Sequence, residues 1–201
     1  APHANNELAR KTGQGMEVPN DYPYTGERWP RAEKNKAAVI TRLDNAVGQI
    51  MAKLKDYNME EDTVIFFTSD NGPHQEGGND PAFFRSAGPF RGIKRSLNEG
   101  GLRVPMIVRW TGKVKANTVS KQVFPFWDVM PTILQIVRIP PPREIDGISL
   151  MPTLIGLPQK QQHDYLYWES HVNGSQQAAR KGDWKVIRPT LGKALELYDL
   201  S

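Results

Sequence analysis

The chain has 201 residues, of which 38% are hydrophobic and 24% are charged, a balance that argues against both a disordered chain and a membrane protein. Its length suffices to bury a substantial core, so we expect one compact domain, or one domain and a small second unit. The net charge of +4 would favour anionic partners, but the basic residues are scattered, and an ordinary solvated surface is the simpler interpretation. The absence of cysteine excludes disulfides, thiolate metal sites and a cysteine nucleophile.

Neither a membrane span nor an export signal is visible in the sequence. The longest apolar stretches, 63–68 and 106–110, are far shorter than the roughly 20 residues that cross a bilayer. The first residues lack the basic and apolar regions of a secretory signal, and the chain does not begin with Met. We therefore expect a mature or trimmed piece whose compartment the sequence leaves open.

The first third of the chain predicts a loop, a helix and a strand. Residues 1–31 are rich in Pro, Gly, Asn and Tyr and show no period, which indicates an extended entry loop. Apolar residues at alternating spacings of three and four then predict an amphipathic helix over 31–57. They are Ile40, Leu43, Val47, Ile50 and Leu54. The strand at 63–68 is apolar on both faces, so helix and strand together favour an αβ unit in a buried, largely parallel sheet.

The remainder of the chain predicts a second strand at 104–110 and then a helix over 128–137 with Asp128 as its N-cap. After three consecutive prolines the pattern changes to short aromatic strands separated by turns, which predicts an antiparallel meander. These strands lie at 165–168, 184–187 and 195–198. We therefore divide the chain into an α/β part, 1–140, and a small antiparallel subdomain, 141–201.

A loop rich in Gly, Pro and Asn follows the first predicted strand and runs to about residue 101. Ligands in open α/β sheets bind beyond the carboxyl ends of the strands, so this loop is the expected site. At its start, Asp70 and Asn71 offer hard oxygen ligands that suit calcium or magnesium. Two ligands cannot complete a calcium site of roughly six to eight oxygens. The alternative is an Asp-Asn-Gly turn that only closes the strand.

Two further residues are candidates for contacts with an anion. Lys94 lies among glycines, where its ammonium can approach a phosphate or sulfate oxygen with little hindrance. His74 could donate to an anionic substrate or act in acid–base catalysis. For both, a solvated side chain in a polar loop is the alternative. On position alone, His3 would be inert at the amino terminus, and we assign His163 and His171 structural or solvent roles.

Seven short sequence segments occur in a fixed order, and the seven together are highly specific for one family. They are Asp62–Gly72, Phe90–Lys94, Asn98–Pro105, Asp128–Thr132, Asp146–Leu150, Gly182–Lys185 and Glu196–Leu200. Together they resemble the latter half of the arylsulfatase-like sulfatases, a formylglycine-dependent, calcium-binding family. The resemblance implies an alkaline-phosphatase-like α/β fold, with a mostly parallel sheet, helices and a small carboxy-terminal antiparallel sheet. It also implies a sulfuric ester hydrolase that acts on a sulfated small molecule or carbohydrate in the periplasm, in a lysosome or after secretion.

The same resemblance implies roles for individual residues. Asp70 and Asn71 match calcium ligands of the family, and Lys94 matches its sulfate-binding lysine. His3 resembles the histidine of the family's Pro-His element, which contacts the sulfate ester and is placed to protonate the leaving group. His74 resembles a substrate-contacting histidine that follows Asp-Asn-Gly in bacterial members.

The departure from the family pattern concerns the nucleophile. The family makes formylglycine from the Cys or Ser of a Cys/Ser-x-Pro-Ser/Ala-Arg motif, and it draws further calcium ligands from an upstream aspartate pair. This chain has no cysteine, and none of its serines begins such a motif. We therefore expect a truncated chain that is inactive alone and binds calcium weakly or not at all.

Two alternatives to the sulfatase remain from the sequence. One is a related phosphoesterase or phosphonate hydrolase of the same fold, and the other is a non-catalytic anion-binding domain. A nucleic-acid partner is not indicated, because clustered elements for base readout or stacking are absent. The sequence gives neither the particular sulfated substrate nor the oligomeric state.

Overall fold

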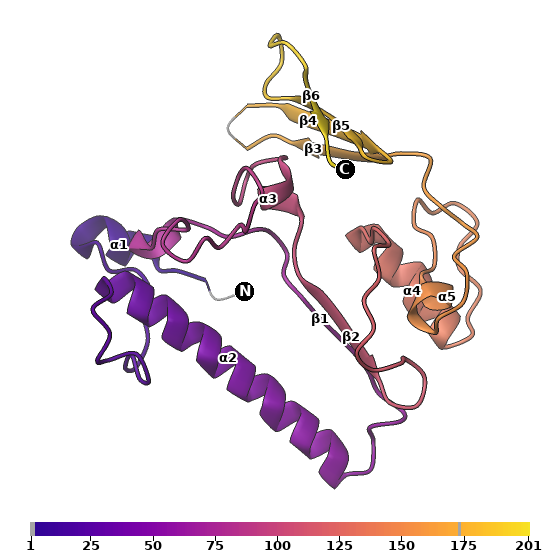
Figure 1. Ribbon diagram of the computed structural model, residues 1–201, viewed down its shortest axis with the longest axis horizontal. Helices are drawn as coiled ribbons and strands as arrows, with labels where there is room; N and C mark the ends of the chain where they lie inside the picture. The colour runs from indigo at the N-terminus through magenta and orange to yellow at the C-terminus, as the bar shows by residue number, and fades with distance from the viewer. Residues whose placement is uncertain (1–2, 173) are drawn as a thin grey trace.

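The computed structural model describes residues 3–172 and 174–201, which form an α/β structure with two antiparallel sheets (Figure 1). A two-stranded sheet lies in the middle of the molecule with helices on either side, and a four-stranded sheet lies at one end. In chain order the elements are α1 (Asn6–Thr12), α2 (Arg31–Asp56), β1 (Val64–Thr68), η1 (Glu76–Gly78), α3 (Glu99–Leu102), β2 (Met106–Trp110), η2 (Phe126–Asp128), α4 (Val129–Ile136), α5 (Met151–Leu154), β3 (Leu166–Ser170), β4 (Gln176–Lys181), β5 (Trp184–Arg188) and β6 (Glu196–Asp199). Within the described residues, none of the helices combines the length and the apolar character needed to cross a membrane.

Helix α1 lies in the segment that the sequence predicts to be a loop. Asn5 caps it by accepting a hydrogen bond from the Leu8 N–H at 3.0 Å, and Gly13 ends it with a left-handed φ of 71°. A helix this short cannot show a sustained apolar period, so only these two capping signals mark it in the sequence. A hydrogen bond from Gly15 N to Gly77 O, 2.9 Å long, then ties this segment to η1.

The helix predicted over 31–57 is confirmed as α2, but its apolar stripe is not its buried face. The helix buries side chains only between Ala32 and Ala38, where Asn35 donates to Met16 O at 2.7 Å. Farther along, Ile40 is 49% exposed and Ile50 is 59% exposed. In Figure 1, α2 runs apart from β1 and β2, so the stripe stays largely in contact with solvent.

Strands β1 and β2 confirm the two strands predicted in the α/β part, but they pair antiparallel, whereas the sequence predicts a largely parallel sheet. Val64 lies opposite Trp110, and Thr68 lies opposite Met106. The connection between them holds only the single turns η1 and α3, whereas parallel strands need a longer crossover, usually a full helix. Strand β1 therefore leads into the site loop, and β2 leaves the loop and runs antiparallel beside β1.

Helix α4 confirms the helix predicted over 128–137, but the side chain of Asp128 does not cap it. This carboxylate is fully buried and accepts hydrogen bonds from the Ile148 N–H and from His163 Nε2, both at 2.9 Å. Burial raises the pKa of Asp128, and the hydrogen bonds from Ile148 and His163 oppose that rise. His163 thus has a structural role, as expected, and it links the segment after α5 to the start of α4.

Thr132 completes this buried junction and gives a test of it. Its Oγ1 donates to Asp128 O at 2.6 Å and accepts from the Leu150 N–H at 3.0 Å. We expect Thr132→Val to lower the free energy of unfolding by about 1–3 kcal/mol, because a buried N–H loses its acceptor. The exposed Thr118 is the matched control, and Thr118→Val should cost less than about 0.5 kcal/mol. Urea denaturation that gave equal costs for both variants would contradict this account.

The carboxy-terminal sheet is the predicted antiparallel meander with one strand more than expected, in the order β3-β4-β5-β6. The added strand, β4, has the sequence Gln-Gln-Ala-Ala-Arg-Lys, which lacks the β-branched and aromatic residues that mark the other three. Ala178 in β4 and Ile187 in β5 are buried together with Leu97 of the site loop. The sheet therefore packs directly on the loop expected to carry the site. The boundary at residue 140 stays a prediction.

Candidate functional site

The loop between β1 and β2 folds back so that its two arms lie against each other (Figure 1). The Gly72 N–H donates to Gly101 O at 2.9 Å, and the Lys94 N–H donates to Pro73 O at 2.8 Å. These bonds join residues 70–74, which follow β1, to residues 91–101, which precede β2. Two motifs that are distant in sequence are therefore neighbours in space.

Gly72 is the point of closest approach between the two arms. A Cβ on Gly72 would lie 1.8 Å from Gly100 O, and a Cβ on Gly100 would lie 2.2 Å from Gly92 O. No side chain larger than hydrogen fits at either position unless the backbone moves. The glycines of the Asp-Asn-Gly and Glu-Gly-Gly motifs are thus required by backbone packing.

Glu76 is the centre of a cluster of basic side chains. Its Oε2 lies 3.1 Å from Lys94 Nζ and 3.9 Å from His3 Nε2, and its Oε1 lies 2.7 Å from the Arg95 guanidinium. His74 joins through the backbone, because the Glu76 N–H donates to its Nδ1 at 3.1 Å. The structure thus brings together His3, His74 and Lys94, three candidate residues predicted from the sequence, around the carboxylate of Glu76, which the sequence does not indicate.

A pocket of about 260 Å³ opens beside this cluster and is lined in part by His74, Glu76, Lys94 and Arg95. The hydrogen bond from Lys94 is the largest influence that lowers the pKa of Glu76, and the charges of Lys94, Arg95 and His74 act in the same direction. One carboxylate therefore faces both an ammonium and a guanidinium group. The cluster retains net positive charge, which suits an anionic ligand.

The lowered pKa of Glu76 predicts a pH dependence of stability. Because this pKa lies below the ordinary value of 4.5 in the folded chain, ionised Glu76 stabilises the fold above pH 4.5, and the contribution is lost as the pH falls through the lowered value. We expect Glu76→Gln to destabilise the chain near neutral pH, with a cost that shrinks in acid. Urea denaturation at several pH values measures this cost. The exposed Glu61 provides the control Glu61→Gln, and a Glu76→Gln cost independent of pH would refute the role given to the carboxylate.

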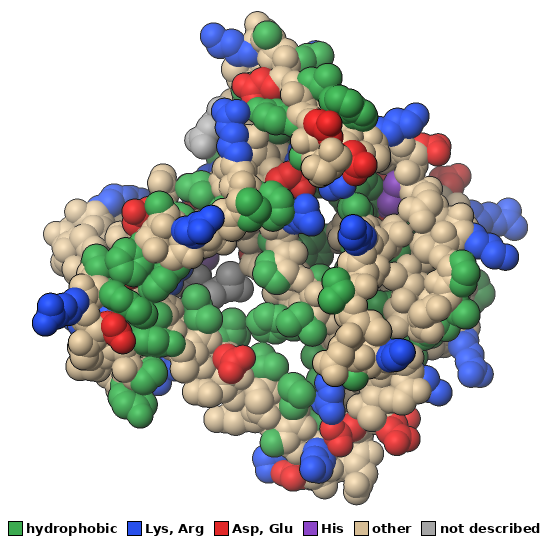
Figure 2. Space-filling view, viewed as in Figure 1, with side chains coloured by type: hydrophobic (Ala, Val, Ile, Leu, Met, Phe, Trp, Pro, Cys, Tyr) green, Lys and Arg blue, Asp and Glu red, His purple; other side chains and the backbone are tan. Residues whose placement is uncertain are grey.

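Asp70 and Asn71 are not among the residues that line the pocket beside the basic cluster. Asp70 lines a larger cavity of about 850 Å³, bordered by β1, β2 and residues of the four-stranded sheet, in a region where Figure 2 shows hydrophobic side chains around openings. The Asp70 side chain is exposed, and no hydrogen bond links its carboxylate to another described residue. Asn71 donates from Nδ2 to Gly72 O at 2.8 Å, and within residues 3–172 and 174–201 its Oδ1 accepts no hydrogen bond.

These two side chains fit calcium only as part of a larger ligand set. Carboxylate and amide oxygens are ligands that calcium prefers, and here neither oxygen group accepts a hydrogen bond from another described residue. Over residues 3–172 and 174–201, however, no group of three or more His, Asp or Glu is arranged to hold a metal ion. Calcium takes roughly six to eight oxygens, so the remaining ligands would have to come from elsewhere.

Glu76 and Arg95 are site residues that the sequence alone does not indicate. Their signals in the sequence are an acidic residue two positions after His74 and a second basic residue directly after Lys94. Neither signal distinguishes a site from a solvated loop. Only the fold of the loop, which places both arms within hydrogen-bonding distance, reveals the pairing.

Residues 1–139 match the family model for sulfatases. The chain belongs to the sulfatase family. Residues 91–201 match a second family model, that of the carboxy-terminal region of N-sulphoglucosamine sulphohydrolase. The chain is 38% identical to N-acetylgalactosamine-6-sulfatase of Canis lupus familiaris over 125 residues, which are 58% of this chain and 22% of that protein. It is 34% identical to N-acetylgalactosamine-6-O-sulfatase of Bacteroides thetaiotaomicron over 168 residues, which are 80% of this chain and 32% of that protein.

Solved structures support the same assignment. The crystal structure of Ps i-CgsB in complex with k-i-k-neocarrahexaose matches with a TM-score of 0.78 and 25% identity, over 91% of this chain and 40% of that one. The predicted sulfatase family and alkaline-phosphatase-like fold are therefore confirmed, and the family is an enzymatic one. This sulfatase chain spans 22% to 32% of the length of the two curated relatives. The roles of its individual residues stay predictions.

Proposed function

We propose that this sulfatase chain supplies the anion-binding and metal-binding part of an enzyme that hydrolyses sulfate esters of carbohydrates. The observation that carries the proposal is the convergence of Lys94, Arg95 and His3 on Glu76 beside a pocket, at the end of a strand that also presents Asp70 and Asn71. The carbohydrate substrate is supported by the two relatives described above, which are named for N-acetylgalactosamine, and by the complex with neocarrahexaose, although other relatives are steryl-sulfatases.

The chemistry of the reaction explains why these residue types would be needed. A sulfate monoester is a poor electrophile whose negative charge is spread over its oxygens. Its hydrolysis requires a strong nucleophile, positive charge around the sulfuryl oxygens and a proton donor for the leaving alcohol. Calcium, when bound with the help of Asp70 and Asn71, would withdraw charge from the sulfuryl oxygens.

The basic cluster would bind and orient the ester. The Lys94 ammonium has three N–H groups, and one of them is directed at Glu76, so the others are available for sulfate oxygens. Glu76 holds the lysine in place through their hydrogen bond. His3, whose Nε2 faces the same carboxylate, would hold the proton that the leaving alcohol needs.

The nucleophile would come from a segment outside these 201 residues. The chain contains no cysteine, and no serine is followed by x-Pro-x-Arg. Of the residues that line the pocket, only Ser96 is of a type from which formylglycine is made; the others are basic, acidic and amide residues and one apolar residue. Ser96 Oγ is already engaged, since it accepts hydrogen bonds from the backbone N–H and the side-chain amide of Asn98.

Titration of the chain with N-acetylgalactosamine 6-sulfate tests the anion-binding part. We expect Lys94→Met to weaken binding by about 10- to 100-fold, since a charge-assisted hydrogen bond is lost. Lys115→Met is the control, because Lys115 is exposed and remote in sequence from the cluster. Calorimetry or chemical-shift titration measures both affinities. Equal affinities for the two variants would contradict the sulfate-binding role of Lys94.

A further inference from the structure

A buried ion pair connects the four-stranded sheet to the site loop. Lys185 in β5 is 1% exposed, and its Nζ lies 2.7 Å from Oε1 of Glu99 in α3. Arg180 in β4 lies 3.6 Å from the other carboxylate oxygen, and the Lys185 ammonium lies 5.2 Å from the centre of the Trp168 ring. A buried ammonium is costly unless it is paired, so the position of Lys185 depends on Glu99.

Glu99 directly precedes the backbone that contacts Gly72. The oxygen that a Cβ on Gly72 would meet at 1.8 Å belongs to Gly100, and the oxygen that accepts the Gly72 N–H belongs to Gly101. All three residues of this arm lie within the four-residue helix α3. A displacement of the Glu99 side chain would therefore displace the surface against which the Asp-Asn-Gly turn rests.

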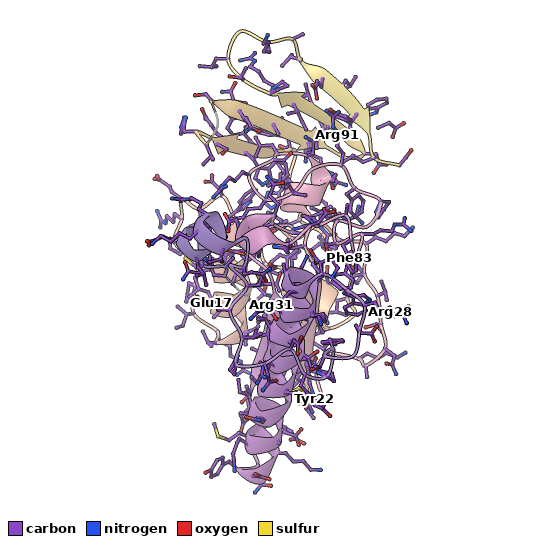
Figure 3. All side chains as sticks on the ribbon, turned by 90° about the vertical axis from the view of Figure 1, so that its left-hand side faces the viewer. Glu17, Tyr22, Arg28, Arg31, Phe83 and Arg91 are labelled. Atoms are coloured by element: carbon purple, nitrogen blue, oxygen red, sulfur yellow. The ribbon has the colours of Figure 1, made fainter. Side chains whose placement is uncertain are left out.

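A second contact between the sheet and the loop is weaker. Arg91 donates from Nη1 to the Tyr198 hydroxyl at 2.9 Å, and Figure 3 shows Arg91 at the boundary between the loop and the sheet. Its side chain is 70% exposed, so water competes for the guanidinium and the contact contributes little. The buried pair is thus the stronger polar link between the sheet and the loop.

We propose that Lys185 is a positioning residue, which holds Glu99, and through it the Gly100–Gly101 turn, against Gly72. The Asp-Asn-Gly turn is thereby fixed from the carboxy-terminal sheet, and the oxygens of Asp70 and Asn71 keep the orientation that a cation needs. The role toward calcium rests on the proposed function, whereas the mechanical link from Lys185 to Gly72 does not. The link also gives a role to the four-stranded sheet, which packs on the site loop but supplies none of the candidate site residues.

Amide hydrogen exchange of the chain tests the link without calcium. Lys185→Met keeps the length and apolar stem of the side chain but removes the charge. We expect exchange at the Gly72 amide to become about tenfold faster relative to amides of α2, because the acceptor arm is loosened. The exposed Lys181, also in the sheet, provides the control Lys181→Met, which should leave Gly72 unchanged.

The pattern of exchange separates positioning from a purely structural role. If exchange rises in β4 and β5 but not at Gly72, the pair serves only the sheet and the proposal is overturned. If Lys185→Met unfolds the chain, the double variant Lys185→Met with Glu99→Gln gives the same comparison, because it removes both charges of the pair. In the double variant, exchange at Gly72 should be no faster than in Lys185→Met alone, since both changes break one link.

Calcium titration of the polypeptide extended upstream of Ala1 tests the functional part. Lys185→Met should bind calcium about tenfold more weakly than Lys181→Met, because it disturbs the orientation of two ligands. Equal affinities would overturn the positioning role. A wild type that binds no calcium would instead contradict the proposed function, and the exchange result would then decide the link to Gly72 by itself.

Discussion

We expect Gly72→Ala to lower the free energy of unfolding by about 3 kcal/mol or more, a loss in the upper range for single substitutions. The added methyl would lie 1.8 Å from Gly100 O and within 3.0 Å of the Gly101 Cα, so it meets backbone that cannot rotate away. Relief requires the two arms of the loop to separate. Separation would also break the hydrogen bond from Gly72 N to Gly101 O. Urea or thermal denaturation measures the loss.

Gly48→Ala is the matched control for this substitution. Gly48 lies within α2, and a Cβ there would meet no atom within 4 Å. Alanine is the better helix former, so this variant should gain roughly 0.5–1 kcal/mol. If Gly72→Ala were as stable as Gly48→Ala, the close packing of the two arms would not exist in solution.

We expect Asp70→Ala to separate function from stability. The Asp70 carboxylate is exposed and accepts no hydrogen bond from the described residues, so its removal should change the free energy of unfolding by less than about 0.5 kcal/mol. Calcium affinity of the polypeptide extended upstream of Ala1 should nevertheless fall by about 100-fold, because affinity depends on the number of charged ligands. Calorimetric titration with calcium measures this loss.

Asp62→Ala controls for the removal of one negative charge. Asp62 is exposed and lies just before β1, at the opposite end of the strand from Asp70. The Asp62→Ala substitution should leave both the free energy of unfolding and the calcium affinity unchanged within error. An Asp70→Ala variant that lost stability instead of calcium affinity would indicate that the residue only closes the strand as a turn, the alternative left open by the sequence.

The sequence predicts those helices and strands whose own residues show a clear pattern, such as a helical apolar period or a run of β-branched and aromatic residues. The stripe from Ile40 to Leu54 predicts α2, and the β-branched and aromatic run at 63–68 predicts β1. Helix α1 is missed because seven residues cannot show a period, and β4 is missed because its residues are polar or alanine. The antiparallel pairing of β1 and β2 depends on a connection without a crossover helix, which no local pattern records.

The candidate site was predictable to a similar extent. The motifs select His3, His74, Lys94, Asp70 and Asn71, but neither spacing nor composition shows that the first three surround Glu76. That arrangement arises from loop packing, in which glycines let two backbone arms touch. The buried Lys185–Glu99 pair joins residues 86 positions apart, so it too is visible only once the chain is folded.

Hydrolysis of an aryl sulfate, measured with the chain alone and with the same chain extended upstream of Ala1, tests the central claim most directly. We expect no turnover by the chain alone, and calcium-dependent turnover by the extended polypeptide that falls by about 100-fold or more in Lys94→Ala. An aryl phosphonate ester assayed in parallel distinguishes the related phosphonate hydrolase. Turnover of the aryl sulfate by the 201-residue chain alone, abolished by Lys94→Ala, would contradict the claim that it holds only part of the site.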